Sequence, residues 1–269
     1  MIRSIIVAFS MFLCSSIYAA DTIKVGILHS LTGTMAISEK GVVDALNLAI
    51  DEINAGGGVL GKKIVASTYD GKSDWDEFAK GAAHLIDKEK VTTIFGCWTS
   101  ASRKKVLPVV ESKKNLLWYP VQYEGMEQSP NIVYTGAAPN QQILPAVDWA
   151  LGNGNLGKNI YLVGSDYVYP RTANKMVKAY VKKSKKGKIV GESYRPLGDS
   201  NFDAIAAKIA KKKPSFIINT INGDSNIAFF KALKKNKVQN IPVISMSIAE
   251  PELKAIGKQV GLSIELSNN

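Results

Sequence analysis

Short apolar runs alternate along this 269-residue chain with longer segments whose apolar residues recur at helical spacing. The apolar runs predict strands, which cover residues 23–29, 63–69, 91–95, 116–119, 159–164, 188–194, 215–221 and 241–245. The amphipathic segments predict helices over residues 42–53, 77–87, 141–151, 171–182, 202–211 and 226–235, with one more starting at Ser100. Strands that alternate with helices predict an α/β fold with mostly parallel sheets.

The alternation of predicted strands and helices is interrupted once, by an extended segment over residues 131–137 that leads into Pro139 and Asn140. It then starts again, so we expect two Rossmann-like lobes with a cleft between them. The first lobe covers residues 21–138 and the second covers residues 139–260.

The first 20 residues have the three parts of a secretory signal peptide. Arg3 supplies the positive charge, residues 5–13 form an apolar stretch too short to span a bilayer, and small residues lead to Ala19 and Ala20. Cys14 follows Leu13, which is too large for a lipoprotein signal. We therefore expect a soluble periplasmic protein that starts at Ala20 or Asp21 and carries no lipid.

The formal net charge is +11, and most of the excess lies in lysine clusters at residues 182–188, 211–213 and 234–237. Such clusters can bind an anionic membrane surface or nucleic acid. Each cluster falls at the end of a predicted helix, where lysine complements the helix dipole, and we favour that simpler role. No aromatic residues are interleaved, so we expect no nucleic-acid partner. No later segment is long and apolar enough to insert stably into a membrane.

Two predicted strands end in segments rich in polar and aromatic residues. The strand over residues 91–95 stops at Gly96, and Ser100 is placed to cap the following helix, where free backbone N–H groups suit an oxygen of a ligand. The strand over residues 116–119 leads into Tyr119, Gln122, Tyr123 and Glu124. Ligands of open α/β sheets sit at the carboxyl ends of strands, so both segments indicate one site.

Several longer motifs resemble those of a known protein family. They are GILHSLTG from Gly26, GCWTSASRK from Gly96, YPVQYEG from Tyr119, TGAAPNQQ from Thr135, SDYVYPR from Ser165 and NTINGDSN from Asn219. In this order they resemble the urea-binding proteins of urea ABC transporters, which are type I periplasmic binding proteins close to short-chain amide and branched-chain amino-acid binders. The resemblance implies two lobes that close on a small solute, permease subunits as partners, and no cofactor, metal or enzymatic activity.

Urea is planar and neutral, with four N–H donors and one carbonyl, so a selective pocket needs several acceptors and one or two donors. Ser100 is expected to hold the carbonyl, acceptors to take the amide hydrogens, and aromatic rings to wall the plane. The expected ligand-binding residues are Trp98, Ser100, Tyr119, Gln122, Tyr123, Glu124, Tyr167, Tyr169, Asp224 and Glu250. Simpler roles stay open for some of them: packing for Tyr167 and Tyr169, a local turn contact for Glu124, and a helix cap for Asp224.

The sequence supports other functions less well. Cys97 with His29 or His84 suggests a thiol–imidazole pair, but no third orienting group is signalled. A cytoplasmic amide sensor would lack the signal peptide. Short amides and branched-chain amino acids remain alternative ligands, although amino-acid binders need a paired grip for ammonium and carboxylate.

The resemblance fades after Leu253, and residues 261–269 look aberrant for the family. Relatives continue beyond this point and return to the first lobe. We therefore expect a truncated or frameshifted chain with an incomplete first lobe and an apolar sheet edge or face uncovered. A non-functional fragment is one alternative, and a second polypeptide that supplies the missing part is another.

Overall fold

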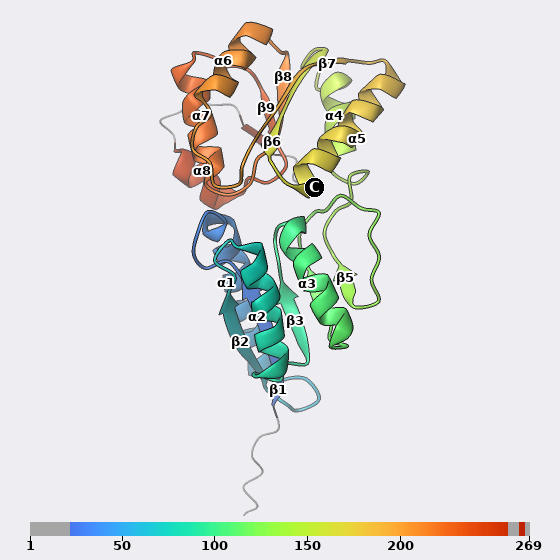
Figure 1. The fold of residues 1–269 in the computed structure, drawn as a ribbon, viewed down its shortest axis with the longest axis vertical. Coiled ribbons are helices and arrows are strands. Elements are labelled where there is room, and N and C mark those ends of the chain that lie inside the picture. The colour runs from blue at the N-terminus through green and yellow to red at the C-terminus, as the bar shows by residue number, and fades with distance from the viewer. Residues whose placement is uncertain (1–21, 258–263, 267–269) are drawn as a thin grey trace, which may run out of the picture.

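The chain forms two α/β lobes that stack end to end (Figure 1). The computed structural model describes residues 22–257 and 264–266. Each lobe contains one five-stranded sheet, and all pairings within the two sheets are parallel. The predicted α/β class with two Rossmann-like lobes and mostly parallel sheets is therefore confirmed.

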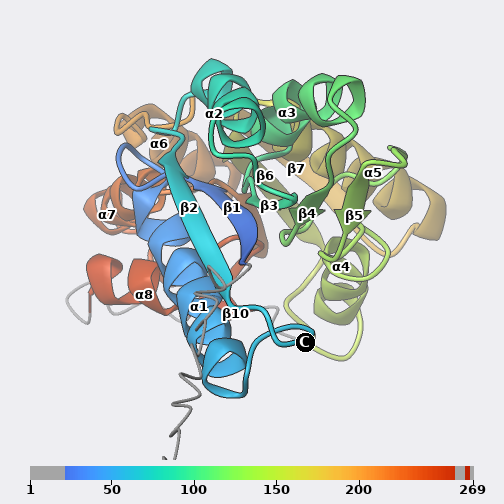
Figure 2. The same cartoon turned by 90° about the horizontal axis from the view of Figure 1, so that it is seen from below.

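Lobe 1 contains the first five strands and three helices. Its sheet has the order β2-β1-β3-β4-β5. Helices α2 and α3 lie on one face of this sheet and α1 on the other (Figure 2). The strands are β1 (Ile23–His29), β2 (Ile64–Asp70), β3 (Thr93–Gly96), β4 (Leu117–Tyr119) and β5 (Ile132–Tyr134), and the helices are α1 (Ala36–Ala55), α2 (Trp75–Asp87) and α3 (Ser100–Ser112).

Lobe 2 has the sheet order β10-β9-β8-β6-β7. Its strands are β6 (Asn159–Ser165), β7 (Lys188–Arg195), β8 (Phe216–Thr220), β9 (Val243–Ser245) and β10 (Ile264–Leu266). Its helices are α4 (Ile143–Leu151), α5 (Val168–Ser184), α6 (Asp203–Lys212), α7 (Ser225–Lys235) and α8 (Glu250–Ile256). Strand β10 falls in the segment expected to be aberrant, yet it pairs in register with β9.

Strands in the middle of both sheets carry the core. The last five residues of β1 and all of β8 are buried, as expected for parallel strands with helices on both faces. In lobe 2, one apolar cluster joins α6, α7 and the sheet, and a second joins α4, α5 and the opposite face. The segments that follow the carboxyl ends of β4 and β9 meet between the lobes, where Gln122 contacts Met246 and Ser247.

Two helices of lobe 1 begin earlier than the apolar pattern indicates. Helix α1 begins at Ala36, whereas the apolar pattern predicts a start at residue 42. The pattern misses the first turn because Ser38 and Glu39 are polar, although both are buried. Helix α2 begins at Trp75, where Asp74 caps it by accepting a hydrogen bond of 2.8 Å from the N–H of Glu77.

The expected signal peptide lies outside the described residues. No helix in the described part of the chain has the length and apolar character needed to cross a membrane. Within the same residues, no group of three or more His, Cys, Asp or Glu side chains is placed to hold a metal ion.

Two glycines offer a matched test of this packing. A Cβ on Gly136 would lie 2.0 Å from the carbonyl oxygen of Val121, whereas a Cβ on Gly41 in α1 would meet nothing within 4 Å. We expect Gly136→Ala to destabilise the chain by about 1–3 kcal/mol because backbone must move. Gly41→Ala is expected to stabilise it by about 0.5–1 kcal/mol through helix propensity. Guanidinium unfolding of both variants measures this, and equal midpoints would contradict it.

Candidate ligand site

The turn between β3 and α3 brings backbone and side chains to the cleft. Gly96 packs so closely on β1 that a Cβ would lie 2.3 Å from the carbonyl oxygen of Leu28. Cys97 then adopts a left-handed conformation with φ of 66°. Thr99 caps α3 by accepting a hydrogen bond of 3.1 Å from the N–H of Ser102. The prediction that Ser100 caps the helix is therefore wrong, because the extended residue before it takes that role and leaves the Ser100 hydroxyl free for other contacts.

Arg103, in the first turn of α3, is fully buried. Its Nη1 donates a hydrogen bond of 3.0 Å to the hydroxyl of Ser100, and its Nη2 donates one of 2.9 Å to Oε1 of Glu124. Its Nε donates to Oε1 of Glu127 at 2.6 Å. A buried guanidinium needs such partners because its charge cannot be hydrated.

Three tyrosine rings surround the same guanidinium. The Cζ atom of Arg103 lies 4.7, 5.3 and 5.6 Å from the ring centroids of Tyr119, Tyr123 and Tyr134. Tyr123 and Tyr134 stack with centroids 4.8 Å apart. The Tyr119 hydroxyl donates a hydrogen bond of 2.6 Å to the carbonyl oxygen of Trp98. Cation–π contacts thus add to the ion pairs that hold Arg103.

The charges of this cluster balance. Arg103 and Lys104 face Glu124 and Glu127, and Lys104 contacts both carboxylates. Burial tends to raise the pKa of Glu127, but hydrogen bonds from Arg103 and Lys104 outweigh it and lower the pKa to about 2. Burial tends to lower the pKa of Arg103, but Tyr119 and the two glutamates raise it above its usual value. We call these four residues, with Ser100 and Tyr119, the Arg103 cluster.

Gln122 connects the Arg103 cluster to lobe 2. Its Nε2 donates hydrogen bonds of 2.9 Å to the carbonyl oxygen of Met246 and 2.8 Å to the hydroxyl of Ser247. Tyr167 and Tyr169 come from the start of α5 and are both buried. Burial raises the pKa of Tyr169, and a hydrogen bond with Gln122 partly opposes this shift. Residues from both lobes therefore meet at one place.

Two of the residues expected to bind the ligand carry a buried polar atom without a hydrogen-bond partner. They are Nε1 of Trp98, a donor, and Oε2 of Glu124, an acceptor. Unsatisfied buried atoms of this kind are rare in folded proteins and call for an explanation. The indole N–H can pair with an acceptor, and the carboxylate oxygen with a donor.

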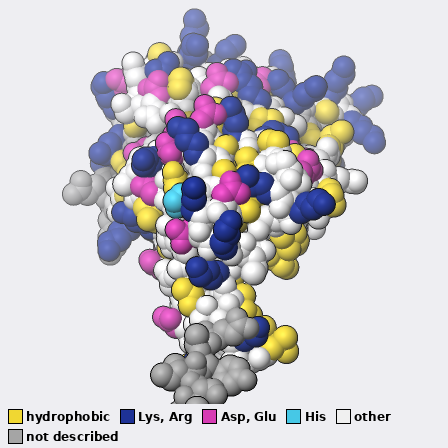
Figure 3. All heavy atoms as spheres, turned by 60° about the horizontal axis from the view of Figure 1, so that its bottom comes forward, with side chains coloured by type: hydrophobic (Ala, Val, Ile, Leu, Met, Phe, Trp, Pro, Cys, Tyr) yellow, Lys and Arg dark blue, Asp and Glu magenta, His cyan; other side chains and the backbone are white. Residues whose placement is uncertain are grey.

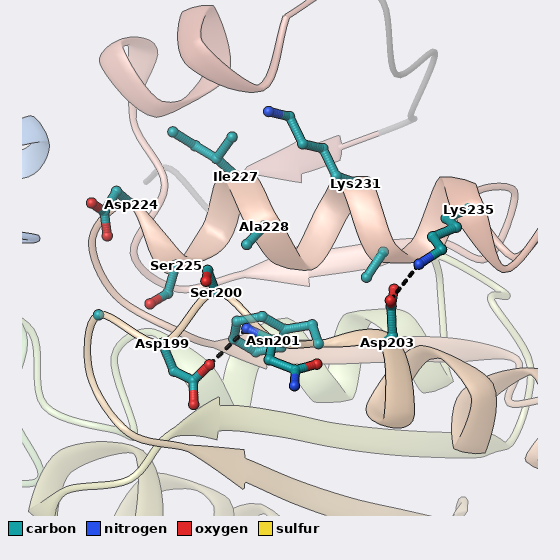
Figure 4. Close-up of a pocket in the computed structure, with 13 residues that line it drawn as sticks. Asp199, Ser200, Asn201, Asp203, Asp224, Ser225, Ile227, Ala228, Lys231 and Lys235 are labelled. Carbon is teal, nitrogen blue, oxygen red and sulfur yellow. Dashed lines mark hydrogen bonds and ion pairs between the residues drawn. The ribbon is translucent and has the colours of Figure 1, made fainter.

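Asp224 and Glu250 are not brought into this group. Asp224 is exposed, and it accepts a hydrogen bond from the Thr34 hydroxyl across the lobes instead of capping α7. It borders a cavity of about 510 Å³ between α7 and residues 198–203 (Figure 4). In that cavity Asp199 and Asp203 already have partners in Asn201 and Lys235. Glu250 is exposed at the first residue of α8.

A second cavity, of about 370 Å³, opens between the lobes. Residues 73–75 and Thr34 line it from lobe 1, and Asp166 with residues 196–197 line it from lobe 2. The ring of Trp75 in this wall lies 6.0 Å from that of Tyr167, and its Nε1 is buried without a partner. Trp75 therefore packs against lobe 2 at the edge of this cavity.

Arg103 and Trp75 are not among the site residues predicted from the sequence. A signal for Arg103 exists, because a cation in the first turn of a helix faces the positive end of the helix dipole and needs another stabilising contact. Trp75 follows the carboxyl end of β2, which is the end that faces the cleft. Neither signal says where the side chain points.

The cysteine and histidines have separate surroundings. Burial raises the pKa of the Cys97 thiol, which makes a thiolate nucleophile unfavourable. Nδ1 of His29 lies 2.8 Å from Oε2 of Glu39, and His84 pairs with Glu89 at 3.5 Å. These contacts do not form the thiol–imidazole pair considered from the sequence.

Comparison with known proteins decides the family. The profile of the periplasmic binding protein domain matches residues 23–263. The chain belongs to this family. Membership implies a periplasmic location. The matching proteins are named as binding and transport proteins and not as enzymes.

The relatives differ in the ligands that their names give. The Leu/Ile/Val-binding protein BraC3 of Rhizobium johnstonii is 26% identical over 199 residues, which are 71% of this chain and 52% of that protein. A solute-binding protein of Rhodopseudomonas palustris HaA2, solved with p-hydroxybenzoic acid, is 26% identical with a TM-score of 0.79, over 91% of this chain and 67% of that one. A Streptococcus pneumoniae protein solved with isoleucine is 22% identical with a TM-score of 0.75, over 89% of this chain and 69% of that one.

The matched regions also show how much of the relatives' length this chain spans. The match to the Leu/Ile/Val-binding protein homolog 8 of Brucella abortus is 34% identical over 91 residues, which are 33% of this chain and 22% of that protein. The chain spans about half the length of BraC3. Neither match assigns a ligand to this chain.

The lowered pKa of Glu127 predicts how stability depends on pH. A carboxylate with a depressed pKa stabilises the fold above its unfolded value near 4.5, and this stabilisation is lost as pH falls toward about 2. We expect Glu127→Gln to remove on the order of 3 kcal/mol of pH-dependent stability over this interval. Guanidinium unfolding between pH 5 and pH 2 measures the slope. The exposed Glu52→Gln is the matched control, and an identical slope in the two variants would contradict the prediction.

Proposed function

We propose that this chain is the solute-binding component of an ABC importer and that it holds urea, or a short amide of similar shape, between its two lobes. The family and the solved relatives support the transport role. The charge-balanced Arg103 cluster, with an unpaired acceptor on Glu124 and an unpaired donor on Trp98 outside the cluster, is the observation that supports the ligand.

The charge balance favours a neutral ligand. An amino acid needs an available cation for its carboxylate and an available anion for its ammonium group. Arg103 already pairs with Glu124 and Glu127 at 2.9 and 2.6 Å. Bringing a further charge into this buried environment would leave it without a partner, which is costly.

Urea matches the unpaired atoms in kind. Its carbonyl oxygen accepts from Nε1 of Trp98, and one of its N–H groups donates to Oε2 of Glu124, both of which are buried and unpaired. The rings of Tyr119, Tyr167 and Tyr169 are buried and provide apolar walls for a planar molecule. Because these side chains are at most 7% exposed, the enclosed ligand has to be small.

Closure of the lobes follows from where these residues lie. Trp98, Ser100 and Glu124 belong to lobe 1, whereas Tyr167 and Tyr169 belong to lobe 2. The ligand therefore binds first to lobe 1, and lobe 2 covers it when Gln122 meets Met246 and Ser247. The permease subunits of the importer then receive the closed form.

A second candidate is a binder of branched-chain amino acids or aromatic acids. The names of BraC3 and of the R. palustris protein favour it, and the tyrosine-rich walls suit an apolar or aromatic side chain. It requires Arg103 to release one of its two glutamates.

Calorimetry separates these candidates. We expect urea and acetamide to bind, and leucine and 4-hydroxybenzoate to give no measurable heat. Trp98→Phe keeps an aromatic ring but removes the indole N–H, so urea binding should weaken by about 5- to 10-fold, the value of one neutral hydrogen bond.

Trp118→Phe is the matched control because Trp118 stacks on Phe95 in lobe 1, away from the Arg103 cluster. It should leave urea binding unchanged. Leucine or 4-hydroxybenzoate binding more tightly than urea would reject the proposal in favour of the second candidate.

A further inference from the structure

The two lobes differ strongly in charge. Residues 22–138 contain 13 Lys and Arg against 13 Asp and Glu, so lobe 1 is neutral. Residues 139–257 contain 19 Lys and Arg against 8 Asp and Glu, which gives lobe 2 a net charge of +11. In Figure 3, blue and magenta side chains mix on lobe 1 in front, whereas mainly blue side chains project from lobe 2 behind it.

The fold of lobe 2 gathers its lysine clusters at one end. The cluster over residues 182–188 leads into β7, Lys158 precedes β6, residues 211–213 precede β8, and residues 234–237 precede β9. These four strands are neighbours in the order β9-β8-β6-β7. Since neighbouring strands lie about 4.8 Å apart, the clusters form one continuous row. We call this end of lobe 2 the basic pole.

The basic pole lies opposite the ligand cleft. In a parallel sheet the amino ends of all strands share one edge, and the cleft is at the other edge. The N–H of Lys188 donates to the carbonyl oxygen of Lys158 at 2.8 Å, and the N–H of Ser215 donates to that of Asn159 at 2.7 Å, which ties the starts of β7, β6 and β8 together. This surface is therefore separate from the proposed solute site.

Few acidic groups offset the basic pole. Asp148, at the end of α4, contacts Lys186 at 2.6 Å, and Asp203, at the start of α6, pairs with Lys235. Most other acids of lobe 2 lie toward the cleft or at helix starts, such as Asp166, Asp199 and Asp224, which follow the carboxyl ends of β6, β7 and β8. Trp149 is 44% exposed beside Asp148. The basic pole thus combines a row of lysines with one exposed indole.

We propose that the basic pole is a docking surface for the anionic headgroups of a phospholipid membrane. Lysines are mobile point charges that suit a fluid layer of phosphates, and an anionic membrane surface attracts such clusters. A protein partner is less suited, because protein interfaces are depleted in lysine and enriched in arginine. An exposed tryptophan is the residue type that settles at the headgroup level.

Co-sedimentation with vesicles tests this inference on the full chain. We expect binding to vesicles of phosphatidylcholine with about 30% phosphatidylglycerol, weaker binding as salt rises, and none to pure phosphatidylcholine. The triple variant Lys211→Gln, Lys212→Gln and Lys213→Gln should lower the partition coefficient by about tenfold or more. Trp149→Phe should abolish the blue shift of tryptophan emission that anionic vesicles induce.

The triple variant Lys88→Gln, Lys90→Gln and Lys114→Gln is the matched control, because these exposed lysines follow helices α2 and α3 of lobe 1 in the same way. It should bind vesicles like the unmodified chain. If the lysines serve only the helix dipoles, both triple variants lose similar stability and neither changes vesicle binding. Equal losses in both variants, or retention on immobilised polyglutamate without vesicle binding, would overturn the proposal, and the latter would favour an acidic protein.

Discussion

A guanidinium without access to water must be surrounded by acceptors, and the burial of Arg103 is the constraint on which the candidate site depends. Ser100, Glu124 and Glu127 each accept one of its hydrogen bonds, and these acceptors come from α3 and from the loop after β4. Removal of one partner from such a group costs about 3–5 kcal/mol because it leaves a buried charge unpaired. Arg103 therefore fixes the loop after β4 against α3.

This loop carries the contacts between the lobes. Gln122 sits two residues before Glu124 and reaches Met246 and Ser247 of lobe 2. A second set of contacts joins α1 and the loop before it to lobe 2, where the Ser38 hydroxyl of α1 donates to Glu252 and the Thr34 hydroxyl of the loop donates to Asp224. Apolar contacts accompany these polar ones, because Trp75 and Ala101 of lobe 1 pack against the cluster of lobe 2 that contains Tyr167.

The sequence predicts strands and most helices well because their apolar periods are strong, but it predicts contacts poorly. Ser100 and Thr99 are both acceptable caps, and only the extended backbone at Thr99 selects it. Asp224 has the residue type and position of a helix cap, yet Thr34 from the other lobe takes its carboxylate. The sequence pattern predicts that Arg103 is an ordinary surface cation in a basic segment. Its burial depends on residues 16 to 31 positions later in the chain, which no local pattern reveals.

The Arg103 cluster balances its own charge, and we propose that it therefore selects a neutral solute. Acetamide and acetate have almost the same shape and differ in charge, so calorimetry with this pair tests the proposal directly. We expect acetamide to bind and acetate, at the same concentration and neutral pH, not to bind. Acetate binding as tightly as acetamide would contradict it, because Arg103 would then be available to an anion.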